Sequence, residues 1–136
     1  MQANAEVARK FNIPEWKIAE RQKAVGDPSR YQGLINAAKA GVTIAFGTDA
    51  GSPVVGHNVI APEMGFMVRV GVKKDNYDAI RSATSVAAQI NKLDKKIGTL
   101  EAGKMADVIV VDGNPLAEIE AIGRVKMTFL EGKRMV

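Results

Sequence analysis

A short apolar run, Val42 to Phe46, constrains the fold of this chain more than any other feature of its sequence. The run contains β-branched residues, follows a helical pattern and ends directly at Gly-Thr-Asp-Ala-Gly, residues 47–51. An almost wholly apolar run of this length is typical of a strand that is buried on both faces, as in a parallel sheet covered by helices. Helix, strand and helix in succession are the local order of an α/β protein, and we therefore expect an α/β fold.

The rest of the sequence divides into a helical part and a β part. Apolar residues spaced along one helix face, with N-capping residues before them and glycines after them, predict the helices. These are expected over residues 14–25, 28–40, 62–70, 76–81 and 85–91. After residue 92, apolar runs between turn-forming residues predict strands over 97–100, 106–111 and 125–130, with a short helix near 116–122.

Length and residue counts limit what these elements can build. The chain has 136 residues, whereas a complete (β/α)₈ barrel needs roughly 250, so any barrel sequence here must be partial. It has no cysteine, which excludes disulfides and thiolate metal ligands. His57 is the single histidine, and catalytic zinc usually takes three protein ligands that are mostly histidine. A complete histidine-rich metal site therefore cannot be built from this chain alone.

The charge distribution predicts an ordinary protein surface. The net charge is +4, but lysines and arginines are interleaved with acidic residues, which favours a mixed solvated surface over a nucleic-acid footprint. No apolar run approaches about 18 residues, so we expect no membrane span. The first residues lack the apolar core of a signal peptide, which favours the cytoplasm, provided that the chain does not begin within a longer protein.

Asp49 and His57 are the candidate functional residues. Asp49 follows the predicted buried strand directly, and in parallel α/β folds the carboxyl ends of the strands carry the chemistry. A carboxylate there can bind a metal or accept a proton, and it can equally cap the next turn through its own backbone. His57 lies in a loop rich in glycine and proline, where it can touch a substrate or be an ordinary surface residue.

Lys104 belongs to two motifs that we interpret as coincidental. Residues 98–104, Gly-Thr-Leu-Glu-Ala-Gly-Lys, satisfy most of the phosphate-binding loop pattern, but Met105 stands where a magnesium-binding hydroxyl is needed. The sequence around Lys104 is also similar to a biotin-carrier turn, except that Gly103 replaces the usual methionine. We expect Lys104 to be an exposed turn residue with neither function.

Three stretches in order resemble the C-terminal third of metal-dependent amidohydrolases, with the imidazolonepropionase and metal-dependent prolidase-like branch as the nearest match. They are Ile-Ala-Phe-Gly-Thr-Asp-Ala-Gly at 44–51, Ala-Thr with a following alanine at 83–87, and the turn-strand-turn segment 97–112. The resemblance covers roughly residues 30–136.

The resemblance implies a fold and a reaction. It implies the C-terminal part of a (β/α)₈ TIM barrel in residues 1–92, with strand eight at 42–47, and the C-terminal strands of an attached β-sandwich in residues 93–136. It implies a zinc or other divalent metal site, at which Asp49 binds the metal and carries the proton from the attacking water to the leaving nitrogen. The implied reaction is hydrolysis of a carbon–nitrogen bond in a small amide, cyclic amide or dipeptide.

The resemblance is also incomplete in a way that limits the function. The His-x-His of strand one, the lysine or glutamate of the middle strands and the two further histidines have no counterpart in the chain. We therefore expect a fragment of a longer enzyme that is inactive and binds no metal alone, with the N-terminal barrel half as its partner and association between copies. The alternative is a non-catalytic α/β interaction or scaffold domain that keeps the family's tail.

Overall fold

The computed structural model describes residues 5–51 and 57–135 as a mixed α/β structure with one small sheet. The helices are α1 (Ala5–Lys10), α2 (Glu15–Gly26), α3 (Gln32–Lys39), α4 (Ile60–Arg69), α5 (Asn76–Ala83) and α6 (Ser85–Ile90). Short 3₁₀ helices are η1 (Pro28–Tyr31), η2 (His57–Val59) and η3 (Ile119–Gly123), and the strands are β1 (Val108–Val111), β2 (Val125–Leu130) and β3 (Lys133–Arg134). No helix in these described ranges is long and apolar enough to cross a membrane.

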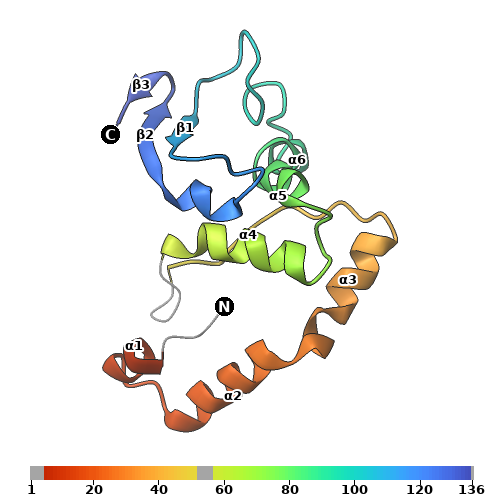
Figure 1. Ribbon diagram of the computed structural model, residues 1–136, viewed down its shortest axis with the longest axis vertical. Helices are drawn as coiled ribbons and strands as arrows, with labels where there is room; N and C mark the ends of the chain where they lie inside the picture. Colours follow the sequence, from red (N-terminus) through yellow and green to blue (C-terminus); the bar gives the residue numbers. More distant parts are fainter. Residues whose placement is uncertain (1–4, 52–56, 136) are drawn as a thin grey trace.

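The first three helices form an arm along one side of the molecule, with α1 at its far end (Figure 1). Ala8 of α1 and Ile18 of α2 are buried, each 2% exposed. The Asp27 side chain accepts a hydrogen bond from the Ser29 amide at 2.9 Å and so starts η1, as the predicted N-cap requires. The rings of Tyr31 and Phe66 pack edge to face with their centroids 4.8 Å apart, and this contact joins the arm to α4.

The core lies between α4, α5 and η3, with η3 next to α4 (Figure 1). Met64 of α4, Ala79 of α5 and Ile119 of η3 form its buried centre. Partly buried apolar residues pack around them, namely Phe46, Val68, Ile80, Ala83 and Ile122. Because Phe46 is among them, the chain segment after α3 is attached to this core through an apolar side chain.

The sheet is antiparallel, in the order β1-β2-β3. Val108 pairs with Phe129 and Val110 with Met127, and an irregularity between Val110 and Val111 shifts the register. The turn that leads from β1 toward η3 is held by Arg124, whose Nε donates to the Asp112 carbonyl at 3.0 Å. The Arg124 guanidinium also pairs with both carboxylate oxygens of Glu118, and this pairing lowers the pKa of Glu118.

The predicted strands at 125–130 and 106–111 are found, the second beginning at Val108, but the other two strand predictions are wrong. Residues 42–50 run without a turn or bend and form no strand, and residues 97–99 are bends. A strand is defined by hydrogen bonds to a neighbour, and within the described ranges no strand pairs with residues 42–46. The short helix expected near 116–122 is a turn followed by η3.

Candidate active site around Asp49

Asp49 ends an extended segment that crosses the molecule behind α4 (Figure 1). We call residues 42–49 the Asp49 segment. The residue is exposed and has a φ of 51°, in the left-handed region that aspartate tolerates better than most residues. Its backbone conformation therefore differs from the extended one, and Asp49 is the last residue of the segment.

The capping role that the sequence left open for Asp49 belongs to its neighbour. The Ala50 amide donates to the Thr48 hydroxyl at 3.1 Å, which closes the turn. Among the described residues, none donates a hydrogen bond to the Asp49 carboxylate or forms an ion pair with it. This carboxylate is therefore available to a ligand.

His57 lies close to this turn. A Cβ placed on Gly51 would be 3.5 Å from Cε1 of the His57 ring, so the exposed imidazole packs against the Gly51 backbone. Gly51 has a φ of 106°, a conformation that favours glycine. Residues 52–56, which belong to the loop expected between the two candidates, lie outside the described residues. The structure thus places His57 beside the chain two residues after Asp49, although no hydrogen bond joins the two side chains.

The Asp49 segment is fixed by two polar contacts with the region of α5. Nζ of Lys73 donates to the Ile44 carbonyl at 2.7 Å, and the Phe46 amide donates to the Ser82 carbonyl at 3.0 Å. Ser82 is completely buried, and its hydroxyl donates to the Ala79 carbonyl. Sequence reasoning missed Lys73, because a Lys-Lys pair after a helix is usually a solvated surface feature.

Glu63 is a second residue that the sequence did not reveal. Glu63 lies in the first turn of α4, which follows η2 directly. Its Oε2 atom is buried without a hydrogen-bond partner among the described residues. Burial raises the pKa of Glu63, because removal from water disfavours the charged carboxylate. The sequence signal for Glu63 is an acidic residue directly after Pro62 in an otherwise apolar helix. The same pattern is typical of an ordinary glutamate in the first turn of a helix, so it does not indicate a functional residue.

Glu63 predicts a pH dependence of folding stability. Because its pKa is raised in the folded chain, Glu63 favours folding most below its ordinary pKa, and stability falls as pH rises through the folded-state pKa. Glu63→Gln is expected to reduce this fall, measured as urea unfolding midpoints between pH 4 and 8. Glu20→Gln, on an exposed part of α2, is the matched control and should leave the profile unchanged. An unchanged profile in Glu63→Gln would contradict this assignment.

The described residues do not by themselves form a metal site. No group of three His, Asp or Glu side chains within residues 5–51 and 57–135 is arranged so that it can hold a metal ion. Asp49 can supply one carboxylate ligand, and His57 one imidazole nearby. A metal ion bound by this chain alone would therefore lack the three protein ligands that zinc usually takes.

We accordingly expect the isolated chain to bind zinc no more tightly than a generic surface site, in about the micromolar range or weaker. Calorimetric titration with zinc measures the affinity directly, and Asp49→Asn should leave it nearly unchanged. Stoichiometric zinc that survives dialysis against a mild chelator would show that this expectation is wrong.

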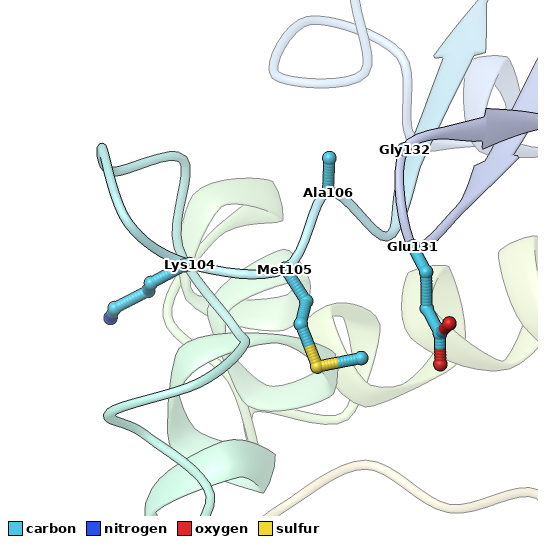
Figure 2. A pocket seen from close by; sticks show the side chains of 5 residues that line it. All are labelled: Lys104, Met105, Ala106, Glu131 and Gly132. Carbon is cyan, nitrogen blue, oxygen red and sulfur yellow. The ribbon is translucent and has the colours of Figure 1, made fainter.

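Lys104 borders an open hollow of about 540 Å³ at the base of the sheet, together with Met105, Ala106, Glu131 and Gly132. Figure 2 shows the Lys104 side chain pointing away from Glu131. A non-helical stretch and then β1 follow Lys104, so the helix start that a phosphate-binding loop needs is missing. The described geometry at Lys104 therefore differs from that of a phosphate-binding loop.

The expected exposure of Lys104 is wrong. Its side chain is only 15% exposed, and Nζ donates to the Thr99 hydroxyl and lies 3.4 Å from a Glu101 carboxylate oxygen. Hydrogen bonding from Thr99 and the nearby Lys104 amine lower the pKa of Glu101. The reason for the burial is local, because the Met105 amide donates to the Lys96 carbonyl and so folds the loop over the lysine stem.

Lys104→Ala is therefore expected to lower the free energy of unfolding by about 1 kcal/mol, because both polar contacts and the packed stem are lost. Lys126→Ala is the control, since Lys126 is 60% exposed and pairs with Asp112 at the surface. Its cost should stay within about 0.5 kcal/mol. Equal effects of the two substitutions in urea unfolding would contradict the structural role of Lys104.

Comparison with known proteins places this geometry in a family. The model of the Amidohydrolase family matches residues 28–135. A 5-methylthioadenosine/S-adenosylhomocysteine deaminase from Symbiobacterium thermophilum is 31% identical over an alignment of 118 residues, and the match covers 70% of this chain and 26% of that protein.

Solved structures agree with this match. A Xaa-Pro dipeptidase with methionine bound in its active site has a TM-score of 0.73 and 34% identity, with 97% of this chain and 32% of that chain covered. A prolidase in complex with N-methylphosphonate-L-proline has a TM-score of 0.71 and 28% identity, with 98% and 32% covered. The chain thus spans less than a third of the length of each of these three proteins.

The resemblance seen in the sequence and these matches rest on the same residues. The Gly-Thr-Asp-Ala-Gly turn that carries Asp49 and the turn-strand-turn segment 97–112 both lie inside the range that the family model matches. The similarity to prolidase-like structures confirms the predicted relationship. This chain belongs to the Amidohydrolase family.

Proposed function

We propose that the chain supplies one part of a hydrolase that cleaves a carbon–nitrogen bond in a small amide, cyclic amide or dipeptide. The observation that carries the proposal is the Asp49 carboxylate, which stands exposed at the end of the extended segment without a partner among the described residues. Family membership and similarity to a Xaa-Pro dipeptidase, a prolidase and a deaminase support the reaction class.

The role that we assign to Asp49 is to carry a proton. Hydrolysis forms a bond between the water oxygen and the carbonyl carbon, breaks the carbon–nitrogen bond and moves one proton from water to the leaving nitrogen. A positioned carboxylate can accept this proton and then donate it to the nitrogen, which prevents expulsion of a poor, anionic leaving group. Asp49 is exposed, so a substrate has access to its carboxylate.

The proposed parent would bind zinc or another divalent metal, which polarises a carbonyl when bound. Because the described residues do not form such a site, the remaining ligands must come from other parts of the parent, and Asp49 is this chain's contribution. His57 is proposed as a substrate-binding residue, since its ring lies on the same turn.

In the proposed parent, residues 1–92 form the C-terminal part of a (β/α)₈ barrel and residues 93–136 part of a composite β-sandwich. The Asp49 segment would then be strand eight. Large apolar side chains that are exposed here support a missing partner surface, among them Leu100 at 85% and Val42 at 56% exposure. The same side chains support association between copies when the partner is absent.

The proposed function is tested by completing the protein. The coding sequence before Met1 is expected to continue in frame into a barrel that contains His-x-His, and the complete protein is assayed on Xaa-Pro dipeptides, N-acyl amides and 5-methylthioadenosine. We expect metal-dependent hydrolysis of at least one substrate class, and none by the isolated chain. Tight assembly without any hydrolysis would support the non-catalytic interaction domain instead and would overturn the enzymatic proposal.

A further inference from the structure

Among the described residues, Lys73 is the one charged residue that is buried. It is 7% exposed, although its neighbour Lys74 is exposed, and its Nζ donates to a backbone carbonyl 29 positions earlier in the chain. Burying a lysine is unfavourable unless its amine is hydrogen-bonded. The contact with Ile44 therefore accounts for where Lys73 lies, and it ties the loop before α5 to the Asp49 segment.

The direction of this contact is informative. In an extended chain, residues two apart turn their backbone groups to the same edge, so the Ile44 carbonyl and the Phe46 amide face one side. The Lys73 amine donates to the Ile44 carbonyl, and the Phe46 amide donates to the Ser82 carbonyl. One edge of the segment is therefore closed by this chain's own groups.

The Val42 amide holds the start of the segment by donating to the Ala37 carbonyl at 3.0 Å, and Lys73 holds it two residues later, at Ile44. A small hollow of about 200 Å³ separates Val42 and Ile44 from Val72, Lys73 and Asp78. Asp78 is the acidic residue that lines it, and one of its carboxylate oxygens accepts the Lys74 amide at 3.2 Å. Apart from the apolar walls of this hollow, Lys73 is the link across it.

We propose that Lys73 is a positioning residue for Asp49, a role that rests on the proposed function. Asp49 lies five positions after Ile44, which is roughly 16 Å of extended chain, so Lys73 does not touch the reacting atoms. It acts by fixing the segment at Ile44, while Phe46 in the core and its bond to Ser82 fix the middle. The contacts at Ile44 and Phe46 together set the direction in which the segment reaches Asp49.

The first experiment measures amide hydrogen exchange in the chain itself. Lys73→Met keeps the length and packing of the side chain and removes the donor. We expect exchange of the Phe46 amide, which donates to the Ser82 carbonyl, to accelerate about tenfold or more, with α4 and α6 unchanged. Lys73→Arg should restore protection, and Lys74→Met should match wild type.

Two results of this experiment would overturn the proposal. One is wild-type protection of the Phe46 amide in Lys73→Met. The other is a uniform loss of protection together with a lower melting temperature, which would show that Lys73 only stabilises the fold. If Lys73→Met does not fold, Lys73→Gln, whose side chain is one atom shorter and carries no charge, weakens the same bond to Ile44 and is measured instead.

The second experiment uses the complete parent enzyme. A displaced carboxylate slows the chemical step more than binding, so Lys73→Met should lower kcat about tenfold or more with KM nearly unchanged. Lys73→Arg should recover most of kcat, and Lys74→Met all of it. Unchanged kcat in Lys73→Met would overturn the positioning role. Inactivity of the wild-type parent would instead overturn the proposed function, and the exchange result would still decide whether Lys73 holds the segment.

Discussion

Gly98→Ala is expected to lower the free energy of unfolding by about 3 kcal/mol, the largest effect on stability that we predict for a single substitution. Gly98 has a φ of 94°, and a Cβ there would lie 2.6 Å from the Ala88 Cβ and 3.1 Å from the Thr84 carbonyl oxygen. Neither neighbour can move away, because both belong to the compact turn and helix at α6. The substitution thus adds an overlap to the strain of a left-handed alanine.

Gly103→Ala is the matched control for this experiment. Gly103 has a φ of 88°, but a Cβ there would meet nothing within 4 Å. It should therefore cost about 1 kcal/mol, from backbone strain alone. The difference between the two variants in urea unfolding isolates the close approach of the loop to α6. Equal losses would show that the loop does not pack against α6 as described.

The sequence predicted those elements whose determinants are local. The helix that starts after Asp75 begins there because the Asp75 side chain accepts the Asp78 amide at 2.8 Å, an interaction between residues three apart. Strand β2 lies at 125–130 as predicted, because β-branched residues between two turns need only one nearby partner. Signals of this kind lie within a few residues of the element that they specify, so a short window of the sequence contains them.

The wrong predictions concern elements that depend on distant partners. Val42 to Phe46 has the composition of a buried strand, yet pairing needs neighbours that these described residues do not provide. Residues 97–100 have strand-like composition, but the approach of Gly98 to α6 bends the chain there. Lys73 shows the same limit at the candidate site, since no local pattern indicates that a lysine will bond a carbonyl 29 residues away.

Asp49 itself was identified from its position after an apolar run and from the family resemblance. Neither showed which turn interaction the carboxylate makes. In the structure the Thr48 hydroxyl, and not the Asp49 carboxylate, accepts the hydrogen bond from the Ala50 amide. A competition between two adjacent side chains for one amide depends on backbone angles, which sequence alone does not specify.

Asp49→Asn is expected to produce the largest effect on catalysis. The amide keeps the size and shape of the side chain but cannot accept a proton, so the complete parent enzyme should lose at least about 10²-fold in kcat. The melting temperature should change little, because the carboxylate is exposed and makes no hydrogen bond or ion pair with the described residues. Loss of rate with retained stability separates a chemical role from a structural one.

The most direct measurement is therefore kcat of the complete parent as wild type, Asp49→Asn and Asp94→Asn, each at a temperature well below unfolding. Asp94 is an exposed turn residue in another part of the molecule and controls for loss of one negative charge. The account predicts a loss of at least about 10²-fold in Asp49→Asn and none in Asp94→Asn. Near wild-type turnover in Asp49→Asn would contradict the role assigned to this carboxylate and, with it, the proposal that the chain brings a catalytic group to an amidohydrolase site.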